Sequence, residues 1–282
     1  MQIGIDVGAT KIESVVLEDN GQESHRSRIA CPKDYTSIVS AIKEIHTKLQ
    51  KEFNRELPIG VCHPGVHSPQ TGLVKNAPNC YWLEKKPFQT DLRKALDREV
   101  FCENDANCFA LGERYFGQAQ HKKHVIGLII GTGFGAGVIL NGTLVSGAHC
   151  GTGEVGMLPY QGSILEHYCS GQFFERFFSE SGAEVYHKAI SGDTEAQAKY
   201  QSFAKHIAEG IKAVLYAYDP EMIVLGGATS RVWSYIEDTV WEGLSTFAYP
   251  QSLKNLIITP SHLEHVAVLG AAALAMDAMS SK

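Results

Sequence analysis

The pattern of hydrophobic and polar residues predicts a chain in which strands and helices alternate. The apolar runs 1–7 and 14–18 flank a short glycine-containing turn, which is typical of two strands joined as a hairpin. Residues 36–53 carry apolar side chains at the spacing of one helical face. The pattern predicts further strands at 59–62, 100–102, 125–130, 138–140, 222–225 and 256–259. It predicts further helices at 88–96, 170–179, 195–218, 233–247 and 267–279, and one after the acidic segment 103–107.

The order of these elements repeats along the chain. Strand pairs come first and strand–helix alternation follows, once before about residue 117 and again after it. Elements in this order are typical of α/β domains, and ligands often bind between two such domains. The sequence therefore predicts two related α/β halves with a cleft between them.

Composition narrows the class of protein. The 282 residues are 44% hydrophobic and 20% charged, as in ordinary globular proteins. A net charge of −6 gives no basic surface for nucleic acid, and no apolar run approaches the ~20 residues that span a membrane. The first residues do not resemble a signal peptide, because Asp6 interrupts the apolar stretch. We therefore expect no nucleic-acid partner and no membrane partner.

The seven cysteines are scattered along the chain, and no two are separated by only one or two residues. An odd and unclustered set is typical of reduced thiols in a cytoplasmic protein. The same spacing disfavours a four-cysteine zinc site. We therefore expect a cytoplasmic protein.

Two glycine-rich turns, about 120 residues apart, are the strongest chemical signal. GIDVGATK occupies 4–11, and GTGFGAG occupies 131–137 directly after the strand predicted at 125–130. Such turns expose backbone N–H groups that an anion approaches without obstruction by side chains. A dinucleotide-binding loop would lead into a helix, whereas the second turn leads into VILNGTLV, where Asn-Gly predicts a β-hairpin. The pair suggests a polyphosphate site; a turn kept only for its backbone geometry is the alternative.

Asp6 adds a carboxylate at the end of the first predicted strand. A buried unpaired carboxylate is costly, whereas one beside nucleotide phosphates can hold Mg²⁺ directly or through water. Thr10 and Lys11 supply a hydroxyl group and a cation for the same phosphates. The alternative is a surface turn that the Asp6 side chain caps.

A third segment, ENDAN at 103–107, places Asp105 between two asparagines at the end of a strand. A carboxylate in this position can accept a proton from an attacking hydroxyl group, and the neutral amides can orient a polar ligand. The alternative is a turn whose side chains cap the following helix. Local preferences favour the cap for Asn107 and leave the two interpretations of Asp105 equal.

Two later segments carry candidate binding residues. Glu154 lies between glycines and Glu166 lies just before a helix, so both carboxylates are candidate acceptors for ligand hydroxyl groups. Stabilisation by the helix dipole would account equally well for Glu166. Gly226 and Gly227 end a strand in DPEMIVLGGATS, which suits the close approach of a flat ring or a ribose. Close packing of a strand against a helix is the alternative there.

Taken together and in order, these segments resemble the ROK family of sugar kinases and repressors, within the actin–hexokinase superfamily of ATPases. The resemblance covers nearly the whole chain and rests on GIDVGATKI, the His-Pro-Gly turn, APNCYW, NDAN, IIGTGFGAG, GEVG, LEHYCSG, DPEMIVLGG and LGAAALA. It is greatest for the fructokinase (mannokinase) and N-acetylglucosamine kinase branch, in which ENDANCFALGE is similar. The resemblance implies two actin-like (ribonuclease H-like) ATPase domains that close over ATP–Mg²⁺ and a hexose. The implied domains are 1–117, joined by a C-terminal helix at about 267–282, and 118–266.

The activity that the resemblance implies is ATP-dependent phosphorylation of a sugar at its primary (6-) hydroxyl group. The implied acceptors are fructose, mannose, glucose, N-acetylglucosamine and N-acetylmannosamine. The alternative is a non-catalytic sugar sensor on the same scaffold. We expect a kinase rather than a repressor, because the phosphate motif begins at residue 4 without a winged-helix extension before it. Relatives are often dimers, so a homodimer is a further expectation.

The resemblance also implies roles for individual residues. Asp105 would be the general base that takes the proton from the sugar hydroxyl group, and Gly65 would shape the floor of the pocket. The other sugar hydroxyl groups would be held by Asn79, Asn104, Glu154 and Glu166. The phosphates would lie against Asp6, Gly8, Thr10, Lys11, Gly131, Thr132 and Gly133, with Mg²⁺ held by Asp6 through water. Gly226 and Gly227 would lie against the adenosine.

The chain departs from the family pattern at three places. The zinc-binding CxCGxxGCxE segment is missing, since only MLPYQGSIL separates Gly156 from Glu166. The histidine that usually follows GE-x-G is Met157 here. We therefore expect no structural zinc and a less polar pocket near Glu154. In addition, Ala9 replaces a glycine of the first phosphate motif, and HLEHVAVLGA replaces the glycine–aspartate segment before the last helix.

Overall fold

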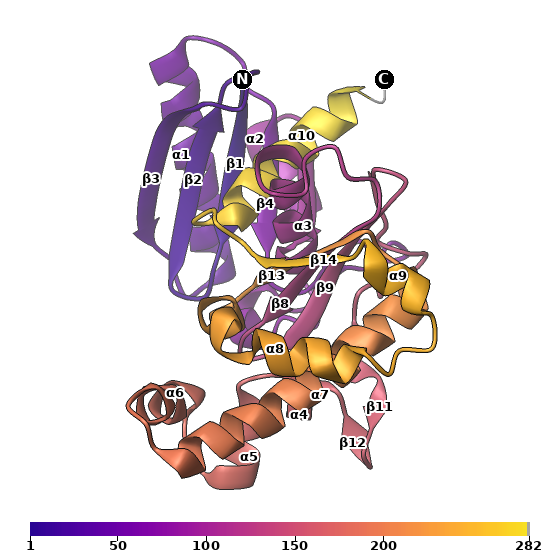
Figure 1. Ribbon diagram of the computed structural model, residues 1–282. Helices are drawn as coiled ribbons and strands as arrows, with labels where there is room; N and C mark the ends of the chain where they lie inside the picture. Colours follow the sequence, from indigo (N-terminus) through magenta and orange to yellow (C-terminus); the bar gives the residue numbers. More distant parts are fainter. Residues whose placement is uncertain (281–282) are drawn as a thin grey trace. The chain divides into compact units, whose positions relative to one another are not determined.

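The computed structural model describes residues 1–280, and the chain divides into two compact units. Unit 1 comprises residues 1–120, 146–151 and the chain from Leu263 onward. Unit 2 comprises residues 121–145 and 152–262. Each unit is built around its own five-stranded sheet (Figure 1). Residues 281–282 of the predicted C-terminal helix lie outside the described residues.

The sheet of unit 1 has the strand order β3-β2-β1-β4-β7. Its strands are β1 (Gln2–Val7), β2 (Lys11–Leu17), β3 (Glu23–Ala30), β4 (Ile59–His63) and β7 (Val100–Asn104). The first three form an antiparallel meander, and β4 and β7 extend the sheet in parallel from the other side of β1. A short hairpin of β5 (Val66–His67) and β6 (Val74–Lys75) and the 3-10 helix η1 (Pro78–Leu83) follow β4.

Helices cover both faces of this sheet. They are α1 (Tyr35–Phe53), α2 (Phe88–Leu96), α3 (Asp105–Phe116) and α10 (Val266–Ser280). Ile38 of α1 and Phe88 of α2 share one core with Ile3 and Ile5 of β1. On the other face, α10 packs against β1, β4 and α3 (Figure 1). The core of unit 1 therefore lies on both sides of the sheet.

The close approach of α10 to the sheet requires glycine in the strands. A Cβ atom on Gly4 would lie 2.2 Å from the backbone oxygen of Val268, and one on Gly60 would lie 1.8 Å from that of Ala271. Because side chains alternate between the two faces of a strand, Asp6 points to the same face as Gly4. The packing of the last helix on the first strand thus places Asp6 on the side of the sheet that α3 and α10 cover.

The sheet of unit 2 repeats this plan in the order β10-β9-β8-β13-β14. Its strands are β8 (Val125–Ile130), β9 (Phe134–Leu140), β10 (Thr143–Leu144), β13 (Met222–Gly226) and β14 (Ile257–Pro260). Again the first three are antiparallel, and the last two continue in parallel from the first. The predicted Asn-Gly turn is confirmed, because Asn141 and Gly142 join β9 to β10 with φ of 53° and 78°. The two sheets therefore share one topology, as the repeated element order predicts.

The longest helix of unit 2, α7 (Thr194–Tyr218), buries one side in the largest core of the unit. The other helices are α4 (Glu166–Cys169), α5 (Gln172–Phe178), α6 (Gly182–Ile190), α8 (Trp233–Leu244) and α9 (Pro250–Lys254). Short elements near the turns are η2 (Val155–Met157), β11 (Pro159–Tyr160), β12 (Ser163–Ile164) and η3 (Ala228–Val232).

Most predicted elements are confirmed, although one helix has shifted bounds and several short or exposed elements were missed. The sequence pattern did not predict β3, because none of its residues is buried and its hydrophobic signal is weak. The helix predicted at 170–179 is α5, which begins at Gln172, and the short helix α4 before it was missed. Gly171 lies between the two helices, and its N–H donates to the carbonyl oxygen of Gly131 at 2.7 Å. The short helix α6 was also missed, although its capping box of Ser181 and Glu184 is a recognisable start signal.

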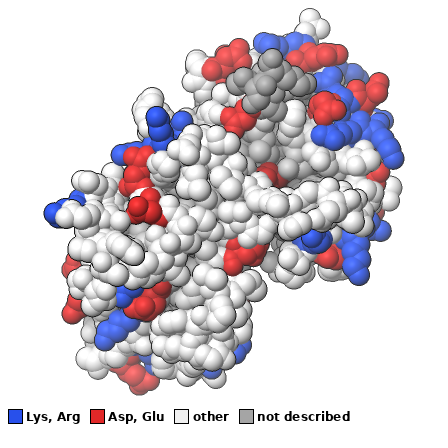
Figure 2. Space-filling model, turned by 90° about the vertical axis from the view of Figure 1, so that its right-hand side faces the viewer, with Lys and Arg blue, Asp and Glu red and all other residues white. Residues whose placement is uncertain are grey.

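The surface of the molecule carries charges of both signs. On the face drawn in Figure 2, Lys and Arg side chains are interspersed with Asp and Glu side chains. No helix among the described residues is long and apolar enough to cross a membrane.

Candidate active site

The first glycine turn joins β1 to β2 in unit 1. The Gly8 N–H donates to the carbonyl oxygen of Lys11 at 2.9 Å, which closes the turn. Ala9, where the family pattern has glycine, packs partly buried against the core, so its additional methyl group is accommodated. Thr10 at the tip is exposed. Its hydroxyl group is therefore accessible to a ligand.

Asp6 is the last residue but one of β1 and is mostly buried, which does not fit the alternative of a surface cap. Burial is the main reason that the pKa of Asp6 is raised to about 6. A hydrogen bond with Cys62 opposes this shift, and the nearby carboxyl groups of Asp105 and Glu13 add to it. Carboxylates gathered in this way repel one another, and a divalent cation would relieve that repulsion.

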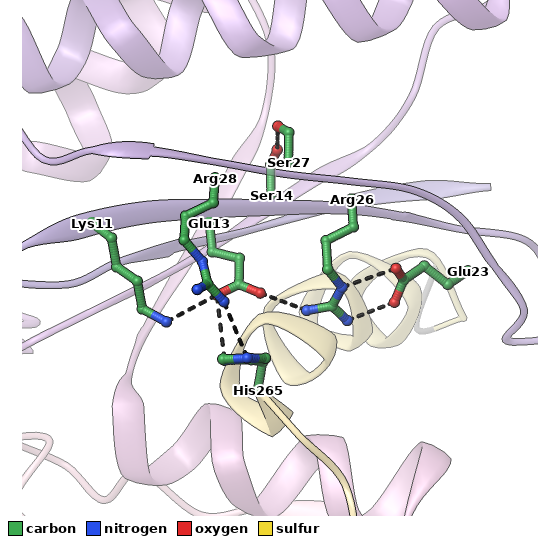
Figure 3. Close-up of polar contacts among 8 residues, drawn as sticks. All are labelled: Lys11, Glu13, Ser14, Glu23, Arg26, Ser27, Arg28 and His265. Atoms are coloured by element: carbon green, nitrogen blue, oxygen red, sulfur yellow. Dashed lines mark hydrogen bonds and ion pairs between the residues drawn. The ribbon is translucent and has the colours of Figure 1, made fainter.

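Lys11 belongs to a cluster of ion pairs on one face of β2 and β3 (Figure 3). At its centre is Glu13, whose side chain is 1% exposed and accepts hydrogen bonds from Lys11 at 3.2 Å, Arg26 at 2.6 Å and Arg28 at 3.2 Å. His265, directly before α10, lies 3.4 Å from the same carboxylate. Although burial acts to raise it, the hydrogen bonds from Arg26 and Lys11 hold the pKa of Glu13 below its usual range. Lys11 is thus held in a fixed place beside the first turn.

Asn104 and Asp105 lie where β7 runs into α3. The Asn104 side chain is the N-cap, since its Oδ1 accepts from the Asn107 N–H at 2.7 Å. This corrects the prediction that Asn107 is the cap, because the capping side chain must precede the N–H that it binds by two or three residues. Asp105 is exposed and accepts from the Ala106 N–H at 2.9 Å. The protein packed around it raises the pKa of the Asp105 carboxyl group, which makes it a better proton acceptor.

Gly65 and Asn79 lie in the segment between β4 and α2 of the same unit. Gly65 has a φ of +80°, and a Cβ atom there would lie 2.5 Å from a backbone oxygen, so only glycine fits this turn. Because β4 pairs in parallel with β7, with His63 opposite Asn104, the turn at Gly65 begins at the edge of the sheet where Asp105 follows β7. Asn79 is exposed on η1.

The second glycine turn joins β8 to β9 in unit 2. It connects two antiparallel strands, which confirms that it is not a dinucleotide loop leading into a helix. The Gly131 N–H donates to the carbonyl oxygen of Gly133 at 3.0 Å. Gly227 has a φ of +78°, and a Cβ atom there would lie 2.5 Å from the backbone oxygen of Ile130. The structure therefore brings the pair Gly226–Gly227 against the start of the second turn.

The Glu166 carboxylate also contacts the second turn. One oxygen, Oε2, accepts from the Phe134 N–H at 3.1 Å, and the other, Oε1, accepts from Gln172 Nε2 at 3.1 Å. A Cβ atom on Gly133 would lie 2.9 Å from Oε2, so glycine makes room for the carboxylate. These contacts give Glu166 a defined position that the dipole of the four-residue helix α4 would not by itself impose.

Glu154 and Met157 are both exposed around η2. In place of the family's zinc-binding segment, the next residues form the hairpin of β11 and β12, with Gln161 and Gly162 at φ of 47° and 74° in its turn. Within the described part of the chain, no group of three or more His, Cys, Asp or Glu side chains is arranged to hold a metal ion.

A cavity of about 640 Å³ opens beside the second turn in unit 2. The turn contributes Gly131 and Thr132 to its wall, and η3 contributes Thr229 and Arg231. Four aromatic residues, Phe174, Tyr186, Tyr200 and Phe203, form a further part of the wall. This volume is within the range of ~300–1,000 Å³ that is usual for small-molecule sites, and aromatic walls with a few polar groups are typical of them.

Of the residues that line this cavity, the sequence predicted Gly131 and Thr132 and not the others. The phenylalanines of α5 gave no distinguishing signal, because Phe173 and Phe174 belong to the core of unit 2 and only Phe174 among them lines the cavity. Gln172 and Arg231 carry no pattern that distinguishes them from surface residues. Their positions follow only from the tertiary structure.

Comparison with known proteins identifies the family. The ROK family model matches residues 2–278. An N-acetyl-D-glucosamine kinase of Haemophilus influenzae is 32% identical over 306 residues, covering 97% of this chain and 99% of that protein. An N-acetyl-D-glucosamine kinase of Pasteurella multocida is 31% identical over 302 residues with the same coverage. These relatives confirm the predicted class of enzyme, a sugar kinase, and not the regulatory alternative.

Solved structures confirm the predicted fold. The ROK hexokinase of Thermus thermophilus matches with a TM-score of 0.88 at 26% identity, covering 100% of this chain and 99% of that one. A ROK family glucokinase of Streptomyces griseus, solved in complex with glucose and AMPPNP, matches with a TM-score of 0.77 at 23% identity, covering 98% and 99%. The two sheets thus have the actin-like ATPase fold. By its sequence and by its fold, the chain belongs to the ROK family.

Proposed function

We propose that the protein is an ATP-dependent kinase for the 6-hydroxyl group of a hexose or N-acetylhexosamine, with N-acetylglucosamine as the first candidate acceptor. The observation that carries the proposal is the cavity of about 640 Å³ that the second glycine turn and an aromatic wall form in unit 2. A nucleoside suits such a cavity, because its ring stacks on aromatic side chains while the turn offers N–H groups to the phosphates. The curated kinases of N-acetyl-D-glucosamine support the choice of acceptor over fructose, mannose, glucose and N-acetylmannosamine.

In this proposal unit 1 supplies the general base. Asp105 is exposed at the start of α3 and has a raised pKa, so it can take the proton of the attacking hydroxyl group. The sugar oxygen then bonds to the γ-phosphorus as the bond from that phosphorus to the ADP oxygen breaks. The proton stays on Asp105 until it is lost to water.

Other side chains would hold the sugar in place for this step. Because Oδ1 of Asn104 caps α3, its Nδ2 is the atom available to donate to a sugar oxygen. Gly65 would leave space for the ring, since a side chain at that turn is excluded. The remaining hydroxyl groups would be bound by Asn79, Glu154 and Glu166.

The phosphates would be bound by the two glycine turns. The residues that we assign to them are Gly8, Thr10 and Lys11 in the first turn and Gly131, Thr132 and Gly133 in the second. Asp6 fits the role of a Mg²⁺ ligand acting through water, because its buried carboxyl group lies near two others and has a raised pKa that a cation would lower. Bound Mg²⁺ would neutralise phosphate charge. Gly226 and Gly227 would lie against the adenosine.

We also propose the broader setting of the enzyme. Residues 1–117 with the C-terminal helix, and residues 118–266, would act as its two domains. The scattered cysteines support a cytoplasmic location, where thiols stay reduced. We further propose that the protein forms a homodimer, a state that the mass in solution will test.

A panel of sugars tests the proposed function. ATP consumption is measured with Mg²⁺ and, in turn, N-acetylglucosamine, N-acetylmannosamine, glucose, mannose and fructose. We expect turnover that depends on the sugar and is fastest with N-acetylglucosamine. ATP consumption that no sugar stimulates would contradict the proposal. Faster turnover with an unmodified hexose would retain the kinase and overturn the preferred acceptor.

A further inference from the structure

The side chain of Gln172, the first residue of α5, makes two hydrogen bonds that have no role in the proposed function as described so far. Its Nε2 donates to the backbone oxygen of Thr132 at 3.1 Å and to Glu166 Oε1 at 3.1 Å. The same side chain lines the cavity beside the second turn. We propose that Gln172 is a positioning residue that couples nucleotide binding at the second turn to sugar binding at Glu166. This inference rests on the proposed function, which assigns phosphate to the turn and sugar to Glu166.

These two hydrogen bonds use both N–H groups of the Gln172 side-chain amide. A glutamine amide has two N–H donors, and both partners here, a backbone carbonyl and a carboxylate, only accept. The nitrogen must therefore face both partners. Glu166 Oε2 accepts from the Phe134 N–H at 3.1 Å, so each carboxylate oxygen has one fixed donor. One acceptor position on each oxygen is left for the hydroxyl groups of a ligand.

The backbone holds the start of α5 in the same place. The Gly171 N–H donates to the backbone oxygen of Gly131 at 2.7 Å, and the Gln172 N–H donates to Ser170 Oγ at 3.2 Å. Ser170 is fully buried. The amide therefore extends from a fixed backbone, and a shift of the second turn moves the Thr132 oxygen against it.

The consequence is a physical link between two binding events. Phosphates bound to the N–H groups of the second turn would fix the Thr132 carbonyl group. Through Gln172 this would fix the orientation of Glu166 before the sugar binds, so that less freedom is lost at that step. By reciprocity, bound sugar would strengthen nucleotide binding by the same factor.

The test compares the wild type with Gln172→Met, which keeps the length of the side chain and removes both donors. Calorimetry measures the dissociation constant of N-acetylglucosamine, or of the best acceptor in the panel, with and without AMPPNP. We expect AMPPNP to tighten sugar binding at least about fivefold in the wild type. In Gln172→Met we expect the sugar affinity to fall roughly tenfold, because the lost hydrogen bond is to a charged group. The ratio of the sugar dissociation constants without and with AMPPNP should approach one, because the link to the second turn is removed.

Gln197→Met is the matched control. Gln197 also donates through Nε2 to a backbone oxygen, that of Ala189 at 3.2 Å, but it does not line the cavity. We expect this variant to keep the wild-type ratio. Two results would overturn the coupling. In one, Gln172→Met keeps the wild-type ratio. In the other, AMPPNP leaves the sugar affinity of the wild type unchanged. A wild type without sugar-stimulated turnover would instead contradict the proposed function.

A second variant keeps the inference testable if Gln172→Met folds poorly. Gln172→Glu keeps the size of the side chain and places a second carboxylate against Glu166, so the two charges repel. We expect its sugar affinity to be lower than that of Gln172→Met, because the repulsion displaces the Glu166 carboxylate, and we expect AMPPNP no longer to tighten sugar binding. A Gln172→Glu protein in which AMPPNP tightens sugar binding as much as in the wild type would contradict the inference, because a merely structural role leaves that ratio unchanged.

Discussion

At the scale of single residues, the two acids of unit 1 that we assign to the site, Asp6 and Asp105, have surroundings that raise their pKa and so act against ionisation. Asp6 is the clearest case, because burial raises its pKa to about 6. A side chain that served only stability would not be a buried acid at this position. The loss of stability from burying an acid is expected where the acid binds a ligand, and here that ligand would be a cation beside the phosphates.

The raised pKa of Asp6 predicts that the folded protein becomes more stable when Asp6 is replaced by a neutral residue. The pKa of Asp6 in the unfolded state is about 3.8, so the group is neutral in both states well below that pH. The folded state loses stability as the pH rises from about 3.8 to about 6, and the loss stays constant above that. We expect Asp6→Asn to be more stable than the wild type at pH 7.5 by up to ~3 kcal/mol, and equal to it at pH 4. Urea unfolding without Mg²⁺ measures the difference, and kinase activity should be lost.

Asp19→Asn provides the control for this prediction. Asp19 is exposed, and its hydrogen bond to the N-terminal amine lowers its pKa, so its removal should give no gain at pH 7.5. A stability difference for Asp6→Asn that stays the same at pH 4 and pH 7.5 would show that ionisation is not its cause.

At the scale of elements, glycine decides how closely helices approach the sheets. We expect Gly60→Ala to destabilise unit 1 by about 1–3 kcal/mol or more, because its Cβ atom would lie 1.8 Å from the backbone oxygen of Ala271 in α10. Thermal unfolding measures the effect. Gly135→Ala in β9 is the control, since no atom lies within 4 Å of its Cβ position. Equal melting temperatures for the two variants would contradict the described packing of α10.

The sequence predicted the elements whose apolar residues are buried in a core, because burial sets their hydrophobic pattern. It missed exposed elements, whose residues carry no such pattern. α2 and β8 have the predicted bounds because their apolar residues face a core. The exposed edge strand β3 gives no such signal. Among candidate site residues, Asp105 could be found because a carboxylate between two amides at the end of a strand can accept a proton, and the family resemblance implied that role. Gln172 was not, because its contact with Thr132 joins residues 40 positions apart and exists only in the folded chain.

At the scale of the whole molecule, one topology is used twice. In each unit an antiparallel meander begins the sheet, and the glycine turn joins its first two strands. The two turns that stand out in the sequence therefore hold equivalent positions in the two sheets. Chemistry then differs between the units: unit 1 carries Asp6 and Asp105, whereas unit 2 carries Glu166 and the aromatic cavity.

The formation of sugar phosphate by the wild type and by Asp105→Asn tests the central claim most directly. With ATP, Mg²⁺ and N-acetylglucosamine, phosphorus NMR should show a 6-phosphate that forms as ADP appears. In Asp105→Asn the rate should fall about 10²–10⁴-fold, as expected for loss of a general base, while ATP binding by calorimetry stays unchanged. Absence of a sugar phosphate in the wild type, or near-normal turnover in the variant, would contradict the account.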